Sequence, residues 1–233
     1  RVLADIFAKS WMARYIPGTL PWIASRVVLA ESTGISKSRL ATASLLEAIV
    51  QVVAIAATAA LIMSFDDRVA AAFGANTRAL VIIGIVALGV LLVPAVFNRL
   101  IRGAYRLVRG HDAYAELSAN AAASSRSFIR YALGSLISGL SYCCLVLAVW
   151  PATETGDLWF IIGIVNLAAA IGMATPFVPS GMGTRDASLL VLLALVIPKE
   201  AALLVTVLSR LWSVGVDLLF LGAANALAKE NEN

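Results

Sequence analysis

Long apolar runs separated by short polar segments constrain this chain more than any other feature. Four runs reach the roughly 20 apolar residues that a helix needs to cross the hydrocarbon core of a bilayer; they cover residues 40–65, 79–100, 128–150 and 201–228. A fifth run, 158–175, is slightly short. The runs lack the polar and apolar alternation of a membrane β-barrel. The sequence therefore predicts an all-α, polytopic integral membrane helical bundle, with residues 1–233 in a single transmembrane domain.

Composition excludes several other classes of protein. The chain is 61% hydrophobic and 14% charged, whereas a soluble domain is about half apolar and a quarter charged, so a water-soluble enzyme is excluded. The net charge of +4 fits basic cytoplasmic loops better than nucleic-acid binding. With one histidine, His111, and two adjacent cysteines, Cys143 and Cys144, the chain lacks a metal-site or hydrolase pattern. We expect no metal, no cofactor, no nucleic-acid partner and no enzymatic activity.

The loop of residues 99–130 predicts the orientation in the membrane. Its acidic residues, Asp112 and Glu116, are outnumbered by six arginines: Arg99, Arg102, Arg106, Arg109, Arg126 and Arg130. The positive-inside rule makes this loop cytoplasmic, which we expect to mean the inner side of a bacterial or archaeal plasma membrane. The orientation of the C-terminus depends on whether the stretch around Pro179 crosses or turns back. Because the chain starts at Arg1 without Met, we expect membrane helices upstream of it.

Two apolar segments are interrupted by proline and glycine. RYIPGTLPW breaks residues 6–30, and PFVPSGMGTRD opens residues 176–197. Lipid cannot satisfy the backbone groups that such breaks release, so we expect re-entrant or half-helix elements inside protein or a polar cavity. Pro17 precedes Glu47 by 30 positions and Pro179 precedes Arg210 by 31. This correspondence favours an inverted repeat, with halves of about 1–100 and 127–228 joined by the loop 101–126.

Ionisable residues inside the long runs are candidates for function, because they are costly in lipid and face the bundle interior. Glu47 and Gln51 share one helix face, and Arg210 and Asp217 share another. One interpretation is structural, with Arg210 paired to Glu47 or to Asp217. The other places these side chains along a polar path for a charged substrate.

The PSGMGTRD stretch resembles an anion cradle. Gly181 and Gly183 let the backbone approach a ligand, and the helix that follows presents free amide groups to an anion. Arg185 adds a planar set of donors suited to phosphate or carboxylate. The alternative is that Thr184 caps the helix, Asp186 complements its dipole and Arg185 reaches a lipid headgroup.

The first break carries a related set of residues. Arg14, Tyr15, Pro17, Gly18, Pro21 and Trp22 lie in it, with Arg26 after it. Aromatic residues beside arginines also form ordinary interfacial anchors. The functional interpretation of this set is favoured because the second break is its counterpart in the other half of the chain.

Taken in order, these motifs resemble the lysylphosphatidylglycerol synthase transmembrane-region family, the flippase-like domain of multiple peptide resistance factors. The likeness runs from about Trp11 to Gly222 and falls on ten positions: Arg14, Tyr15, Pro17, Gly18, Glu47, Pro179, Gly181, Gly183, Arg185 and Arg210. Ser180 and Asp186 stand where many relatives have Gly and Glu, which puts the headgroup preference in doubt. The N-terminal helices usual in the family are not visible.

The resemblance implies movement of a lipid with a polar, phosphate-containing headgroup between leaflets, such as an aminoacyl phospholipid or a polyprenyl-phosphate sugar. It does not imply synthesis, which belongs to a separate soluble domain in larger relatives. The partners implied are membrane lipids, with a homo-oligomer or a lipid-modifying enzyme as further partners. Two other functions stay open: an accessory or scaffold subunit for a glycosyltransferase or lipid-modifying enzyme, and a carrier of small soluble anions.

Overall fold

Helices form all the regular structure in the part of the chain that the computed structural model describes, namely residues 6, 9–13, 20–29, 37–74, 76–91, 99, 121–175 and 183–229. The elements are α2 (Leu20–Leu29), α3 (Lys37–Met63), α4 (Asp67–Phe73), α5 (Thr77–Leu91), α7 (Ala121–Val149), α8 (Asp157–Ala174), α9 (Thr184–Leu193) and α10 (Lys199–Lys229). The prediction of an all-α protein is confirmed.

Four of these helices are long and apolar enough to cross a membrane. The spans are Ala43–Met63 in α3, Ala123–Val149 in α7, Asp157–Ala174 in α8 and Lys199–Ala224 in α10. α5 contributes a shorter apolar stretch, Thr77–Ala87, and the predicted run of 79–100 is described as a continuous helix only to Leu91. α10 leaves large apolar side chains such as Trp212 and Leu219 exposed, as expected of a helix in contact with lipid. The chain is an integral membrane protein with several helices across the bilayer.

Helix α8 forms the centre of the bundle and packs against α3, α7 and α9. Its Ile161 and Ile164 are fully buried, together with Val146 of α7 and Leu193 of α9. Close packing needs glycine here, because a Cβ on Gly163 would lie 2.4 Å from the Met63 side chain of α3. The core therefore lies around the C-terminal half of the chain, with α5 at the periphery against α3 and α4.

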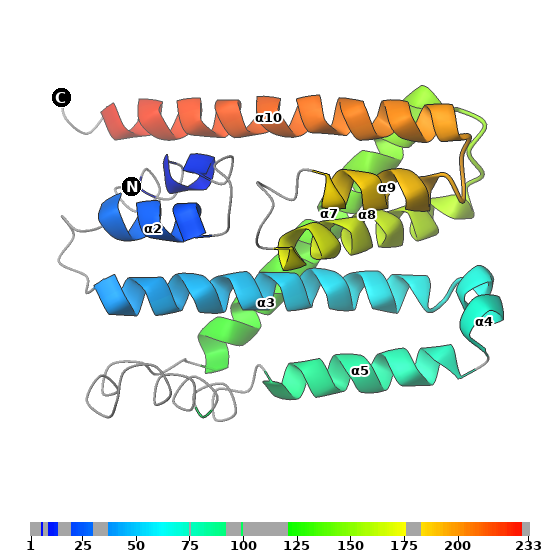
Figure 1. Ribbon diagram of the computed structural model, residues 1–233, viewed down its shortest axis with the longest axis horizontal. Coiled ribbons are helices and arrows are strands. Elements are labelled where there is room, and N and C mark those ends of the chain that lie inside the picture. The colour runs from blue at the N-terminus through cyan, green and yellow to red at the C-terminus, as the bar shows by residue number, and fades with distance from the viewer. Residues whose placement is uncertain are drawn as a thin grey trace.

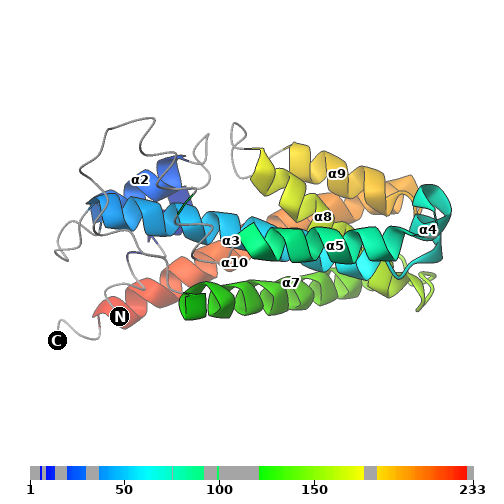
Figure 2. The ribbon, with the colours of Figure 1, turned by 90° about the horizontal axis from the view of Figure 1, so that it is seen from below.

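The two interrupted segments occupy opposite ends of the bundle. α2 lies at the end that holds both chain termini, whereas α8 and α9 lie toward the other end (Figures 1 and 2). The turns after α3, α7 and α9 all lie at that second end, called the Asp66 end below (Figure 1). α9 thus returns to the end from which α8 starts, so α8 and α9 run antiparallel to one another (Figure 1). The C-terminus consequently lies at the same end of the bundle as the beginning of α7.

An ion-pair network, called the Arg68 network below, closes the Asp66 end. Arg68 Nη2 lies 2.8 Å from Asp66 Oδ2 and 2.9 Å from Asp157 Oδ1, and its guanidinium stands 4.2 Å above the centre of the Phe160 ring. Hydrogen bonds from the Arg68 side chain lower the pKa of Asp66 below its ordinary value, and the bond to Asp66 raises the pKa of Arg68. The network joins the α3–α4 turn to the start of α8.

Candidate functional site

Four side chains from α7, α9 and α10 meet between the helices and form what we call the Arg185 cluster: Tyr142, Arg185, Asp186 and Arg210. Arg185 Nη2 donates a hydrogen bond to the hydroxyl oxygen of Tyr142, and the Arg185 guanidinium lies 5.9 Å from the centre of that ring. The Asp186 carboxylate lies between two guanidiniums: its Oδ1 is 4.0 Å from Arg185 Nη1 and its Oδ2 is 3.5 Å from Arg210 Nη2. The aspartate is therefore loosely held by both arginines.

The Arg185 cluster carries an excess of positive charge, because two arginines and one aspartate sum to +1. Asp186 Oδ1 and Arg210 Nη2 are buried and lack a hydrogen-bond partner among the described residues. A buried polar atom without such a partner costs about 1–3 kcal/mol. A ligand oxygen that accepts from these guanidiniums would remove part of that cost and balance the charge, and phosphate has the required geometry.

Two glycines allow the backbone to hold Arg185 in the Arg185 cluster. Gly183, immediately before α9, has a φ of +94°, a left-handed conformation that favours glycine. Gly172 of α8 lies so close to α9 that a Cβ there would be 2.6 Å from Arg185 Cβ. A hydrogen bond of 2.8 Å between the hydroxyls of Thr175 and Thr184 joins the end of α8 to the start of α9. The sequence of the second break thus fixes Arg185 against α8.

A second group of polar side chains, the Glu47 cluster, comes from α2, α3 and α7: Arg26, Ser44, Glu47 and Tyr131. Arg26 Nη1 lies 2.5 Å from Glu47 Oε2 and 3.3 Å from Ser44 Oγ. The Tyr131 hydroxyl donates to Glu47 Oε1 at 2.6 Å. Arg26 is buried, with 8% of its surface exposed, and Glu47 is its counter-charge. The Arg26–Glu47 contact is shorter than either contact that Asp186 makes with an arginine.

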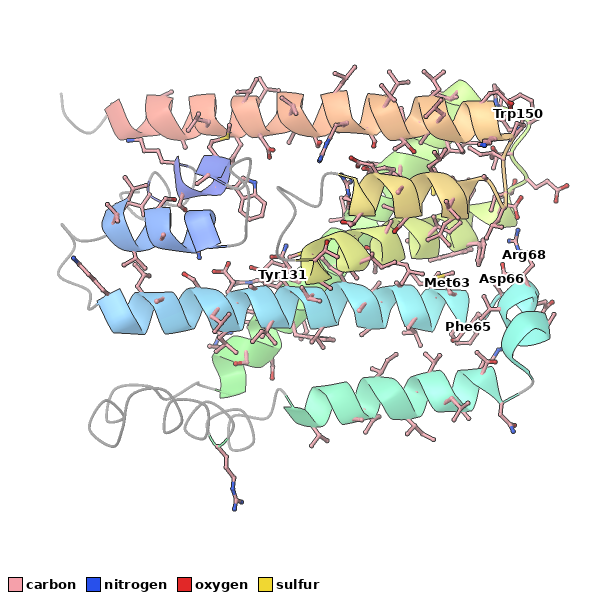
Figure 3. The ribbon with its side chains drawn as sticks, viewed as in Figure 1. Met63, Phe65, Asp66, Arg68, Tyr131 and Trp150 are labelled. Carbon is pink, nitrogen blue, oxygen red and sulfur yellow. The ribbon has the colours of Figure 1, made fainter. Side chains whose placement is uncertain are left out.

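Helix α7 contributes one tyrosine to each of the two clusters. Tyr131 and Tyr142 are eleven positions apart, which is close to three helical turns, so they share one face of α7. Figure 3 shows Tyr131 beside α3, well away from the Asp66 end where Phe65, Asp66 and Arg68 lie. One helix face therefore carries a hydroxyl to each charged cluster.

The structure corrects the predicted pairing of interior charges. Arg210 pairs neither with Glu47 nor with Asp217, because its carboxylate partner is Asp186 of α9. Glu47 pairs with Arg26 instead. The Asp217 carboxylate accepts a hydrogen bond of 3.3 Å from Trp11 Nε1. The short helices α2 and α9 supply the partners that the long helices were expected to give one another.

The other predicted site residues fall into two groups. Gln51 is half-buried one turn after Glu47 in α3, and Gly183 precedes α9. The remaining four, Arg14, Tyr15, Gly18 and Gly181, lie outside the described residues, as do Pro17 and Pro179. Of the predicted residues that the structure describes, Arg185, Asp186 and Arg210 lie in the Arg185 cluster and Glu47 lies in the Glu47 cluster.

Sequence reasoning did not select Tyr131, Tyr142 or Ser44. Tyrosines inside an apolar run look like interfacial anchors, and serines are common in membrane helices. The eleven-residue spacing of the tyrosines, combined with the two breaks, was the signal that could have found them.

The comparison with protein families agrees with this architecture. Residues 6–220 match the family described as the lysylphosphatidylglycerol synthase TM region. The chain belongs to this family, which consists of membrane proteins associated with lipid modification or flipping. No curated protein and no solved structure matches the chain significantly.

Proposed function

We propose that this protein moves a lipid with a phosphate-containing headgroup between the two leaflets of a membrane, and that it transports this lipid without modifying it. The headgroup would be that of an anionic phospholipid, an aminoacyl phospholipid or a polyprenyl-phosphate sugar. The observation that carries the proposal is the Arg185 cluster, a site of charge +1 between membrane-spanning helices with donors left for a ligand. A lipid keeps its tails in hydrocarbon while its headgroup needs such a polar route.

The two interrupted segments support a transport cycle. Each ends in a helix that brings an arginine to a cluster, Arg26 from α2 and Arg185 from α9, and the two helices lie at opposite ends of the bundle (Figure 1). We interpret them as the two halves of an inverted repeat, the arrangement from which alternating access is built. The basic segment 99–130 is not all loop, because its last ten residues form the start of α7. With this segment assigned to the cytoplasm by the positive-inside rule, the end of α10 is cytoplasmic and the Asp66 end faces outward.

Reconstituted vesicles test the proposal. We expect the wild-type protein to bring fluorescent phosphatidylglycerol from the inner leaflet to an impermeant quencher outside, faster than in protein-free vesicles. Arg185→Gln removes charge-assisted hydrogen bonds worth about 1.5–3 kcal/mol, so the rate falls about 10- to 150-fold. The matched control, Arg126→Gln, removes an exposed arginine of α7 and keeps the wild-type rate.

Three other results would contradict the proposed site or the proposed function. Equal rates for wild type and Arg185→Gln would remove the Arg185 cluster from the path. If the wild type moves neither phosphatidylglycerol nor a polyprenyl-phosphate probe, transport is wrong and the accessory-subunit function takes its place. Uptake of a small soluble anion into vesicles of neutral lipid would instead support the anion carrier.

A further inference from the structure

Two buried atoms of the Arg185 cluster lack a hydrogen-bond partner among the described residues, and their chemistry is opposite. Arg210 Nη2 carries N–H donors, whereas Asp186 Oδ1 is a carboxylate acceptor. Arg185 Nη1 lies 4.0 Å from that acceptor, which is beyond hydrogen-bonding distance. An ionised phosphodiester satisfies the donor, because its oxygens accept from guanidiniums. It has no N–H or O–H for the acceptor, so a ligand that completes this cluster must bring a donor as well.

The structural interactions of Asp186 leave this acceptor unused. The residue lies in the first turn of α9, where a carboxylate complements the helix dipole. Its other oxygen, Oδ2, lies 3.5 Å from Arg210 Nη2. Neither interaction gives Oδ1 a hydrogen bond. By comparison, the two oxygens of Asp66 accept hydrogen bonds of 2.9 and 2.8 Å from the Arg68 side chain. Asp186 Oδ1 is therefore an acceptor that a ligand can use.

The charged side chains of the cluster are partly open to their surroundings. Those of Arg185, Arg210 and Asp186 are 19%, 22% and 25% exposed. A guanidinium has five N–H groups, and Arg185 uses one of its nitrogens to donate to Tyr142. Arginine side chains are long and have several rotatable bonds, so a phosphate that engages both guanidiniums can draw them aside from Asp186 Oδ1. A group attached to that phosphate then reaches the carboxylate.

Charge determines which kind of donor fits beside the phosphate. A singly negative phosphodiester that carries a hydroxyl brings the cluster from +1 to neutrality. A phosphodiester that carries an ammonium group is neutral overall and leaves the charge of the cluster unbalanced. The ammonium group would also lie at Asp186 Oδ1, close to the Arg185 guanidinium, and like charges repel strongly where water screens them little. The cluster therefore fits a neutral hydroxyl.

We propose that Asp186 is a specificity-determining residue, through which the Arg185 cluster selects a phosphodiester headgroup with a neutral hydroxyl over one with no donor or with an ammonium group. The phosphate accepts from Arg185 and Arg210, and the hydroxyl donates to Asp186 Oδ1. Glycerol and sugar phosphodiesters have this chemistry. The inference rests on the proposed transport function and narrows its range of headgroups, because an aminoacyl phospholipid carries an ammonium group and is disfavoured.

Three lipids with the same acyl chains test this selectivity. Phosphatidylglycerol is singly negative and carries hydroxyls, phosphatidylethanol has the same charge without a donor, and phosphatidylethanolamine carries an ammonium group. Titration of the purified protein with nanodiscs that hold each lipid in phosphatidylcholine measures the affinities. We expect the wild type to bind phosphatidylglycerol about 10- to 150-fold more tightly than phosphatidylethanol, the range for one charge-assisted hydrogen bond. It should also bind phosphatidylglycerol more tightly than phosphatidylethanolamine.

Substitutions of Asp186 separate its role as an acceptor from its charge. Asp186→Ala should abolish the preference for phosphatidylglycerol over phosphatidylethanol, while phosphatidylethanol binds at least as tightly as before because a like charge beside its phosphate is lost. Asp186→Asn keeps the shape of the side chain and a neutral acceptor, so the preference should fall severalfold. Glu154→Ala removes an exposed carboxylate from the α7–α8 turn and should keep the wild-type preference.

Three results would overturn the inference and leave the transport function standing. They are equal affinities of the wild type for phosphatidylglycerol and phosphatidylethanol, an affinity for phosphatidylethanolamine that reaches that for phosphatidylglycerol, and a wild-type preference in both Asp186 variants. A wild type that binds none of the three lipids more tightly than phosphatidylcholine contradicts the proposed function as well.

Discussion

The Arg185 cluster and the Arg68 network contain the same residue types in opposite proportions. In the interior, one aspartate lies between two arginines at 3.5 and 4.0 Å. At the Asp66 end, one arginine lies between two aspartates at 2.8 and 2.9 Å. The second arrangement is compact and its groups satisfy one another. The first leaves buried atoms without hydrogen bonds among the described residues, so the contrast separates a structural network from a site with capacity for a ligand.

Reversing the charge of the interior cluster should have the largest effect. Arg185→Gln combined with Arg210→Gln changes its charge from +1 to −1, and loss of two charge-assisted contacts of about 1.5–3 kcal/mol each should weaken phosphatidylglycerol binding by at least about 100-fold. Titration of the purified protein with lipid nanodiscs measures this. The matched control, Arg68→Gln combined with Arg78→Gln, removes two arginines near the Asp66 end and should leave binding unchanged. Equal weakening in both proteins would show that total charge alone attracts the lipid.

A substitution in α8 can change the position of Arg185 without altering any charged residue. Gly172→Ala introduces a Cβ 2.6 Å from Arg185 Cβ and 3.4 Å from its Cα, so α8 and α9 must separate. We expect a loss of about 1–3 kcal/mol in stability, with weaker lipid binding. Gly215→Ala in α10 has no atom within 4 Å of the new Cβ and should be neutral. Thermal unfolding and nanodisc titration test both variants, and unchanged affinity in Gly172→Ala would mean that the cluster does not need this close packing.

The smallest effect is expected at the Asp66 end, where the network should respond to acid. Asp66 has a pKa below its ordinary value of about 3.9 because Arg68 donates to it. Its stabilising contribution is therefore complete above about pH 4 and is lost as the pH falls through the folded-state pKa. The exposure of Arg68 limits that contribution to about 1 kcal/mol or less.

Thermal unfolding between pH 3 and 7 checks this prediction. Asp66→Asn should lower the midpoint slightly at pH 7 and reduce the loss of stability below pH 4. Asp67→Asn, at the fully exposed neighbouring position, should behave as wild type. An acid response unchanged by Asp66→Asn would place the sensitive group elsewhere.

Much of the fold could be predicted from the sequence, because lipid imposes simple rules on length and polarity. The apolar runs predicted the long helices, and the Pro and Gly breaks predicted the interrupted segments. Glu47 and Arg210 were recognised as interior charges for the same reason. Their partners were not, since pairing depends on how each helix is rotated and how deeply a half-helix reaches. Arg26 illustrates this: at position 26 it looks like an interfacial anchor, and only the placement of α2 against α3 brings it to Glu47.

The spacing of the two tyrosines on α7 also sets a length scale. Eleven residues at 1.5 Å each separate Tyr131 from Tyr142 by about 16 Å along the helix axis, and the hydrocarbon core of a bilayer is about 30 Å thick. The two tyrosines are therefore separated along one helix face by about half the thickness of a hydrocarbon core. A headgroup that passed along this face would meet a hydroxyl at two levels of the bundle, one beside Glu47 and one beside Arg185.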